Sequence, residues 1–256
     1  MTKRSNWSIP YLVFLILFVV LPLLLVVLYA FQGADGRFTF ANITRFFGDA
    51  DALGTFALSI EVAIENTLLC ILLGYPAAWI LSNRQLNRSA VIIVLFILPM
   101  WINALMRTLA TAELFTMLGF TLGKGTLLFG MVYDYLPFMI YPIYNILDKM
   151  DKSYAEAAQD LGATPWRVFW KVTVPLSLPG VASGVLMVFM PTVSTFAISE
   201  FLTNNKIKLF GTIISENINS SMWNYGAALA FMMLIIIGIT SLLSGDDEKA
   251  AEGGLL

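Results

Sequence analysis

The chain has 256 residues, of which 58% are hydrophobic and only 12% are charged, and its formal net charge is −2. Because soluble domains carry about 25% charged residues, this composition excludes an ordinary soluble domain. The sequence has no histidine and one cysteine, Cys70, so we expect neither a disulfide framework nor a metal site.

Six apolar stretches are long enough to cross a bilayer as helices, for which about 20 residues are needed. The first is too long for the apolar part of a signal peptide, so we expect it to be retained. The alternating ten-residue segments of a membrane barrel are absent from the sequence. The predicted fold class is an all-α integral membrane protein with a single domain. Its expected spans are residues 10–31, 58–81, 90–112, 126–147, 177–200 and 222–243.

Lysine and arginine in the connections predict the orientation, because they favour the cytoplasmic side of a membrane. With the N-terminus inside, nine of the 15 basic residues fall on the inner side and five on the outer side, and Arg107 remains in a span. We therefore expect both termini in the cytoplasm and residues 148–176 to form the longest inner loop. The inner residues are Lys3, Arg4, Arg84, Arg88, Lys149, Lys152, Arg167, Lys171 and Lys249, and the outer residues are Arg37, Arg45, Lys124, Lys206 and Lys208.

The segment GFTLGKGT (119–126) has the glycines of a nucleotide-binding loop but not their spacing. The spacing is one residue short, and Gly125 stands where a serine or threonine must bind magnesium. We therefore expect no nucleotide site in this chain and interpret the segment as a flexible outer loop.

The inner loop contains a polar helical hairpin, YAEAAQDLGATPWRVFWKVTVPLSLPG (154–180). Ser153 and Glu156 fit a capping box, Gly162 stands where a left-handed residue ends a helix, and Thr164 begins a second helix. The first helix has little side-chain bulk with which to anchor itself, so it suits a groove in another protein, although an ordinary helical loop is the alternative. The second helix is expected to lie on the bilayer surface with its aromatic residues down.

The hairpin also resembles a known motif. EAA at 156–158 is followed by three residues and Gly162, and nine residues later by VTVP at 172–175. This spacing resembles the EAA loop of permeases in binding-protein-dependent ABC importers, with valine in place of isoleucine and leucine in I-x-L-P. The resemblance implies a type I importer fold in which a cytoplasmic coupling helix docks into the ATPase. The residues that it assigns to this contact are Glu156, Ala157, Ala158 and Gly162.

Three longer segments resemble the permeases of spermidine/putrescine importers: LGYPAAWIL (73–81), LPMWINALMRTLA (98–110) and LPFMIYPIYNILDKMDKSYAEAAQDLGA (136–163). The resemblance implies a polyamine permease in a bacterial plasma membrane. Its implied partners are two copies of an ATPase that binds the ATP, a second permease, an extracytoplasmic substrate-binding protein and membrane lipid. No cofactor or nucleic acid is expected on this chain. Thiamine or an opine-like compound remains open as the cargo.

Charged side chains within spans are candidates for function, because burying a charge in a bilayer is costly. In the predicted topology five acids lie toward the outside, namely Glu61, Glu65, Glu113, Asp134 and Glu200. Together with aromatic residues they would attract a polyamine by charge and by cation–π contacts. The alternative is that these acids are solvated span ends and that the aromatic residues are interface anchors. Arg107 is expected to pair with an acid, and the predicted path residues are Asp134, Glu200, Glu65, Trp101 and Tyr133.

An intramembrane enzyme and a secondary transporter are the competing classes. Tyr133-Asp134 matches half of an intramembrane aspartyl protease site, but the partner Gly-x-Gly-Asp is missing, and so is the serine-protease motif G-x-S-x-G. A secondary transporter typically has an internal repeat, which the sequence does not show. We therefore expect no catalytic residues in this chain.

Overall fold

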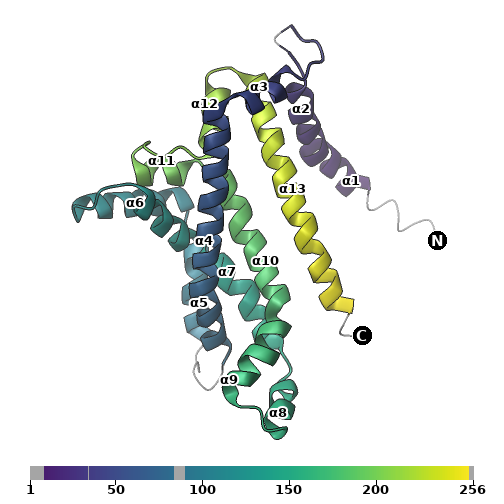
Figure 1. The fold of residues 1–256 in the computed structure, drawn as a ribbon, viewed down its shortest axis with the longest axis vertical. Helices are drawn as coiled ribbons and strands as arrows, with labels where there is room; N and C mark the ends of the chain where they lie inside the picture. Colours follow the sequence, from purple (N-terminus) through teal and green to yellow (C-terminus); the bar gives the residue numbers. More distant parts are fainter. Residues whose placement is uncertain (1–8, 34, 84–89, 254–256) are drawn as a thin grey trace, which may run out of the picture.

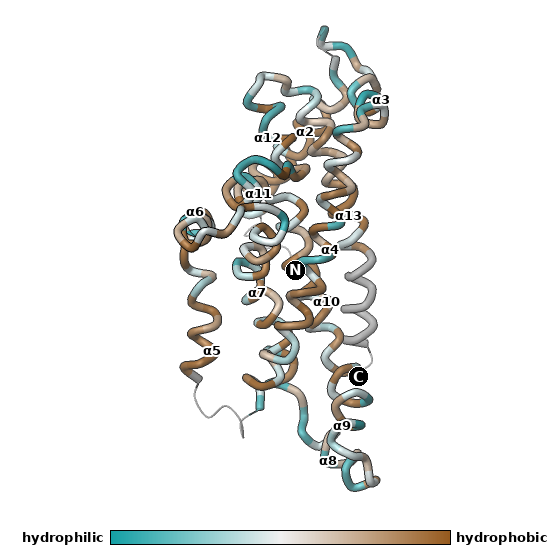
Figure 2. Tube along the Cα trace, turned by 60° about the vertical axis from the view of Figure 1, so that its left-hand side comes forward, coloured by the Kyte–Doolittle hydropathy of each residue, from teal (hydrophilic) through white to brown (hydrophobic). Residues whose placement is uncertain are grey.

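The computed structural model describes residues 9–33, 35–83 and 90–253, and within these ranges the chain is almost entirely helical. Figure 1 shows an elongated bundle that has α8 and α9 at one end and α3 and α12 at the other. We call these the α8 end and the α12 end. Hydrophilic residues gather around α8 and near α3 and α12, whereas α5 is mostly hydrophobic (Figure 2).

The elements in chain order are α1 (Ile9–Leu15), the π-helical η2 (Ile16–Val20), α2 (Leu21–Ala30), α3 (Ala41–Gly48), α4 (Ala50–Ser82), α5 (Ala90–Ile97), the 3-10 turn η3 (Leu98–Trp101), α6 (Ala104–Met117), α7 (Lys124–Lys149), α8 (Ser153–Asp160), α9 (Pro165–Val168), the π-helical η4 (Phe169–Thr173), α10 (Val174–Ser194), α11 (Ala197–Thr203), α12 (Phe210–Asn219) and α13 (Trp223–Gly253). Four residues of the orientation prediction lie outside the described ranges: Lys3, Arg4, Arg84 and Arg88.

Five helices of the described ranges are long and apolar enough to cross a membrane. They contain the second and fourth predicted spans, the first and sixth apart from end residues, and most of the fifth. With 33 residues, α4 is about 50 Å long, whereas the hydrocarbon core of a bilayer is about 30 Å thick. The helix α4 is therefore longer than a bilayer core is thick. The five helices are Pro10–Ala30, Ala50–Ser82, Lys124–Lys149, Pro165–Ser194 and Trp223–Leu242.

The third predicted span, 90–112, is wrong as a continuous helix. The chain bends by 93° between Val91–Trp101 and Ala104–Met117. Pro99 lacks the N–H that an α-helix needs, and the side chain of Asn103 accepts hydrogen bonds from the first backbone N–H groups of α6. These two residues end one helix and begin another, although the stretch is mostly apolar.

The fifth predicted span also differs, because the helix ends at Ser194 rather than at residue 200. Thr195 has an extended backbone, and α11 follows as a separate short helix. At its other end, the span continues through η4 to Pro165. The prediction that the second helix is separate is therefore wrong, since this segment runs without a break into α10.

The core of the bundle is the contact of α7 with α4 and α10, where small residues let the helices approach closely. A Cβ atom on Gly184 would lie 2.7 Å from Sδ of Met139, and one on Gly180 would lie 3.0 Å from the carbonyl oxygen of Pro142. Glycines of this kind allow close packing in membranes, where interhelical hydrogen bonds also contribute. Asn66 of α4 donates such a bond to Oγ1 of Thr192 on α10 at 2.8 Å.

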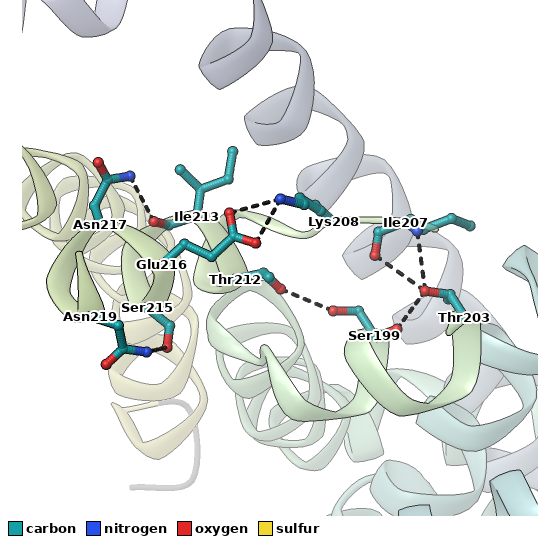
Figure 3. A network of polar contacts seen from close by, with 10 residues as sticks. All are labelled: Ser199, Thr203, Ile207, Lys208, Thr212, Ile213, Ser215, Glu216, Asn217 and Asn219. Carbon is teal, nitrogen blue, oxygen red and sulfur yellow. Dashed lines mark hydrogen bonds and ion pairs between the residues drawn. The ribbon is translucent and has the colours of Figure 1, made fainter. Parts of the chain in front are cut away.

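The α12 end is held by polar contacts between α11, α12 and the loop that joins them (Figure 3). The hydroxyl groups of Ser199 and Thr212 lie 3.2 Å apart, and Lys208 donates hydrogen bonds to both carboxylate oxygens of Glu216. The short helix α11 is thereby held beside α12, and it also packs on α6 and α7. Together α6 and α11 project sideways from the bundle (Figure 1).

Candidate functional site

The first part of the candidate site is α8, which lies at the tip of the molecule (Figure 1). None of its residues is buried, and Leu161, which follows it, is 90% exposed. Of the four residues that the EAA resemblance selects, three are exposed, and Ala158 is half-buried. A short helix that buries no side chain in its own protein leaves its surface accessible.

The N-terminus of α8 is capped differently from the prediction. Ser153 is already the first helical residue, and no side-chain cap forms at Lys152, so the predicted capping box of Ser153 and Glu156 is wrong. Instead, the backbone N–H of Ser153 donates to Oδ1 of Asp151 at 2.9 Å. This hydrogen bond lowers the pKa of Asp151 below its usual value, because it stabilises the carboxylate.

The turn after α8 matches the prediction. Gly162 has φ +84°, in the left-handed region, and a Cβ atom there would meet no atom within 4 Å. Backbone conformation rather than lack of space therefore favours glycine at this position. The backbone N–H of Ala163 donates to the carbonyl of Ala158 at 3.0 Å, which closes the end of the helix. Thr164 caps α9, as predicted.

Aromatic rings connect the hairpin to the spans. The ring of Phe169 lies edge-on to Trp79 and Tyr75 of α4, with centroid distances of 5.4 and 5.9 Å. The hydroxyl of Tyr75 lies 2.7 Å from Oγ of Ser177 on α10. Aromatic pairs of this geometry stabilise by about 0.5–1.5 kcal/mol beyond their buried area. These contacts therefore join the hairpin to α4 and α10.

The second part of the candidate site is a cavity of about 430 Å³ at the break between α5 and α6. Two of the predicted path residues, Asp134 and Trp101, line it. Trp101 is 86% exposed, so the cavity is bordered by an accessible aromatic ring. The lining residues are Met100, Trp101, Ile102, Asn103, Ala104, Arg107, Asp134, Tyr135, Phe138 and Ile198.

Asp134 forms an ion pair with Arg107, as the sequence led us to expect of this arginine. Nη2 of Arg107 lies 3.1 Å from Oδ1 of Asp134, and their side chains are only 6% and 2% exposed. The hydroxyl of Thr108 donates to the other carboxylate oxygen at 3.1 Å. The guanidinium also lies 5.6 Å from the centroid of the Tyr133 ring, within the range of a cation–π contact.

Glu65 lies elsewhere, on α4, where it faces the first turn of α7. Lys124 donates hydrogen bonds to Glu61 at 2.7 Å and to Glu65 at 2.9 Å. The sequence placed Lys124 in an outer loop and did not predict that it neutralises Glu61 and Glu65. The signal that could have found it is a lysine at the start of one span facing two glutamates four residues apart on another.

The predicted path residues thus divide into separate groups. Asp134 and Trp101 share the cavity and Tyr133 stacks near Arg107, whereas Glu65 belongs to the lysine cluster. Glu200 is partly exposed on α11, two residues after Ile198, which reaches the cavity. The five acids therefore do not form one continuous negative surface, because Arg107 and Lys124 neutralise part of it.

Comparisons with known proteins agree with the membrane architecture. A family model described as "Binding-protein-dependent transport system inner membrane component" matches residues 5–245. The chain is 32% identical over 253 residues to the spermidine/putrescine transport system permease protein PotB of Escherichia coli K12, covering 90% of this chain and 92% of that protein. It is 30% identical over 249 residues to PotB of Haemophilus influenzae, covering 88% and 87%.

Two solved structures share the fold. One is a bacterial ABC transporter involved in the import of the acidic polysaccharide alginate, with a TM-score of 0.67, 12% identity and coverage of 97% of this chain and 95% of that chain. The other is the MetNI methionine ABC transporter in inward-facing conformations, with a TM-score of 0.63, 14% identity and coverage of 78% and 95%. At these identities the likeness concerns the fold alone.

Proposed function

Because the chain belongs to the family of binding-protein-dependent transport system inner membrane components and is a permease subunit of an ABC importer, we propose that its cargo is a polyamine, spermidine or putrescine. The similarity to PotB over nine tenths of both chains supports this cargo. The relatives are transport components rather than enzymes, so the chain works as a membrane subunit without covalent catalysis.

The observation that carries the coupling role is the exposed α8 at the tip of the bundle, with EAA at 156–158 and a left-handed Gly162 after it. In our proposal α8 seats in a groove of the ATPase. Closure of the ATPase on ATP then moves the hairpin, and the aromatic contacts with Trp79 and Tyr75 pass the movement to the spans. In this proposal the ATPase binds the nucleotide, and α8 of this chain transmits the movement to the spans.

We further propose that the α8 end faces the cytoplasm and the α12 end faces outward. The excess of basic residues on the inner side supports this orientation. α13 runs from the α12 end toward the α8 end, so the C-terminus then lies on the cytoplasmic side (Figure 1). The binding protein would deliver its ligand at the α12 end.

A second permease subunit is expected against the sideways projection of α6. This region exposes large apolar side chains that the rest of the chain does not bury, and their contact with water would be unfavourable. Within the bilayer a companion permease or lipid covers them, and two such chains enclose one path. The exposed side chains include Trp101, Met106, Leu114, Met117 and Phe120.

Uptake of labelled spermidine and putrescine tests the cargo. Cells without their own polyamine uptake would carry the ATPase, the second permease and the binding protein, with or without this chain, and labelled thiamine would serve as the comparison. We expect uptake of a polyamine, and not of thiamine, only when this chain is present. Chain-dependent uptake of thiamine alone would show that the cargo is wrong while leaving the permease role intact.

A further inference from the structure

The ion pair of Arg107 and Asp134 is deeply buried and incompletely partnered. Its closest contact, 3.1 Å to Oδ1 of Asp134, satisfies the distance of an ion pair but not the geometry of a hydrogen bond. Among the residues that the structure describes, Oδ1 therefore has no hydrogen-bond donor, and Nε and Nη1 of Arg107 have no acceptor. Buried polar atoms are nearly always paired in folded proteins, so unpaired atoms here require an explanation.

The incomplete pair borders a space that could hold a ligand. Both residues line the cavity of about 430 Å³ at the break between α5 and α6. Ligand pockets commonly have volumes of about 300–1,000 Å³, so the cavity can accept part of a flexible chain such as a polyamine. An ammonium group entering it would find a carboxylate oxygen that lacks a donor.

Tyr133 offers the guanidinium a second position. Its ring is already within 5.6 Å of Cζ of Arg107, and the side chain of Tyr133 is 43% exposed. A cation released from Asp134 can therefore remain over the aromatic face without crossing into lipid. The surroundings thus provide two sites for one cation, a carboxylate and a ring.

We propose that Arg107 is an exchangeable counterion of Asp134, which a substrate ammonium group displaces during transport. This inference rests on the proposed polyamine cargo. In this structure the guanidinium of Arg107 is paired with the carboxylate of Asp134. When the ammonium enters, it donates to Asp134, and Arg107 moves to the ring of Tyr133. Because Arg107 stays tethered beside the site, its return expels the ammonium, which prevents the path from trapping its cargo.

The test is the KM and kcat of spermidine uptake by the full set of subunits, with Arg107→Gln, Asp134→Asn and the double variant. Removing the competitor in Arg107→Gln should lower KM by about tenfold, the lower end of the coupling between close charge pairs. Asp134→Asn should raise KM, and the double variant should match Asp134→Asn, because Arg107 acts only through that carboxylate. An unchanged or raised KM in Arg107→Gln would overturn the proposal and leave the ion pair with a structural role alone.

If the Arg107→Gln protein is not present at normal abundance, a second pair of variants tests the exchange. Tyr133→Leu removes the ring and should raise KM by about threefold, whereas Tyr133→Phe keeps the ring and should raise KM less than Tyr133→Leu does. Equal KM values for these two variants would refute the exchange. Absence of polyamine uptake by the unaltered complex would instead refute the proposed cargo, and the exchange would fail with it.

Discussion

Replacing Gly162 by alanine tests whether the turn after α8 must keep its left-handed backbone for transport. The new Cβ atom would meet no atom within 4 Å, so no clash contributes. The remaining cost is that of placing a non-glycine residue at φ +84°, about 1–2 kcal/mol. Since α8 buries no residue, this helix has little other stabilisation to offset the cost. The population of the native turn should therefore fall by about 5- to 30-fold.

The assay is uptake and ATP hydrolysis by the assembled complex at equal abundance of subunits. We expect the rate of uptake to fall as the population of the native turn falls. Gly162→Asn should lose less uptake than Gly162→Ala, because asparagine tolerates the left-handed region. Gly119→Ala is the matched control, since Gly119 has φ +76° and equally open space but lies between α6 and α7. Normal uptake in Gly162→Ala, or equal loss in the control, would refute the coupling role of this turn.

Three further predictions concern the bundle and the start of α8. Gly184→Ala should destabilise the complex by about 1–3 kcal/mol through overpacking against α7, whereas Gly54→Ala, where a Cβ meets nothing, should be neutral or stabilising in thermal unfolding. A double-mutant cycle of Asn66→Ala and Thr192→Ala should give a coupling of about 0.6–2 kcal/mol across their hydrogen bond, and additive effects would contradict it. The lowered pKa of Asp151 means that its stabilisation of α8 is present above the usual carboxyl pKa of about 3.9 and is lost as pH falls through the lowered value. The protection of the α8 amides, taken relative to their intrinsic exchange rates, should therefore stay the same between about pH 7 and 5, and a loss of protection in that window would contradict this assignment.

The coupling hairpin was largely predictable because its signals are local. Spacing of EAA and Gly162 places the turn, and the structure confirms both the left-handed glycine and the Thr164 cap. The capping box failed because Asp151, two residues before Ser153, offers the backbone N–H an acceptor that starts the helix one residue earlier. Several polar residues near a helix start compete, and the pattern alone does not rank them.

The path residues were less predictable, because their partners come from distant parts of the chain. Lys124 and Glu61 are 63 residues apart in sequence but share a hydrogen bond. Arg107 lies beyond the 93° bend that follows Trp101, and it meets Asp134 on another helix, α7. Hydropathy averages over such a bend and describes the stretch as one span.

The sequence by itself determined the membrane class, the existence of the spans and the coupling motif, since each depends on composition or on spacing within a few turns of helix. Only the tertiary structure decided which acids remain free and where the third span breaks. Whether a charge is available depends on the cations that packing brings within a few ångströms. Here packing placed Arg107 on Asp134 and Lys124 on two glutamates, and so it left one incompletely partnered ion pair at the edge of a cavity.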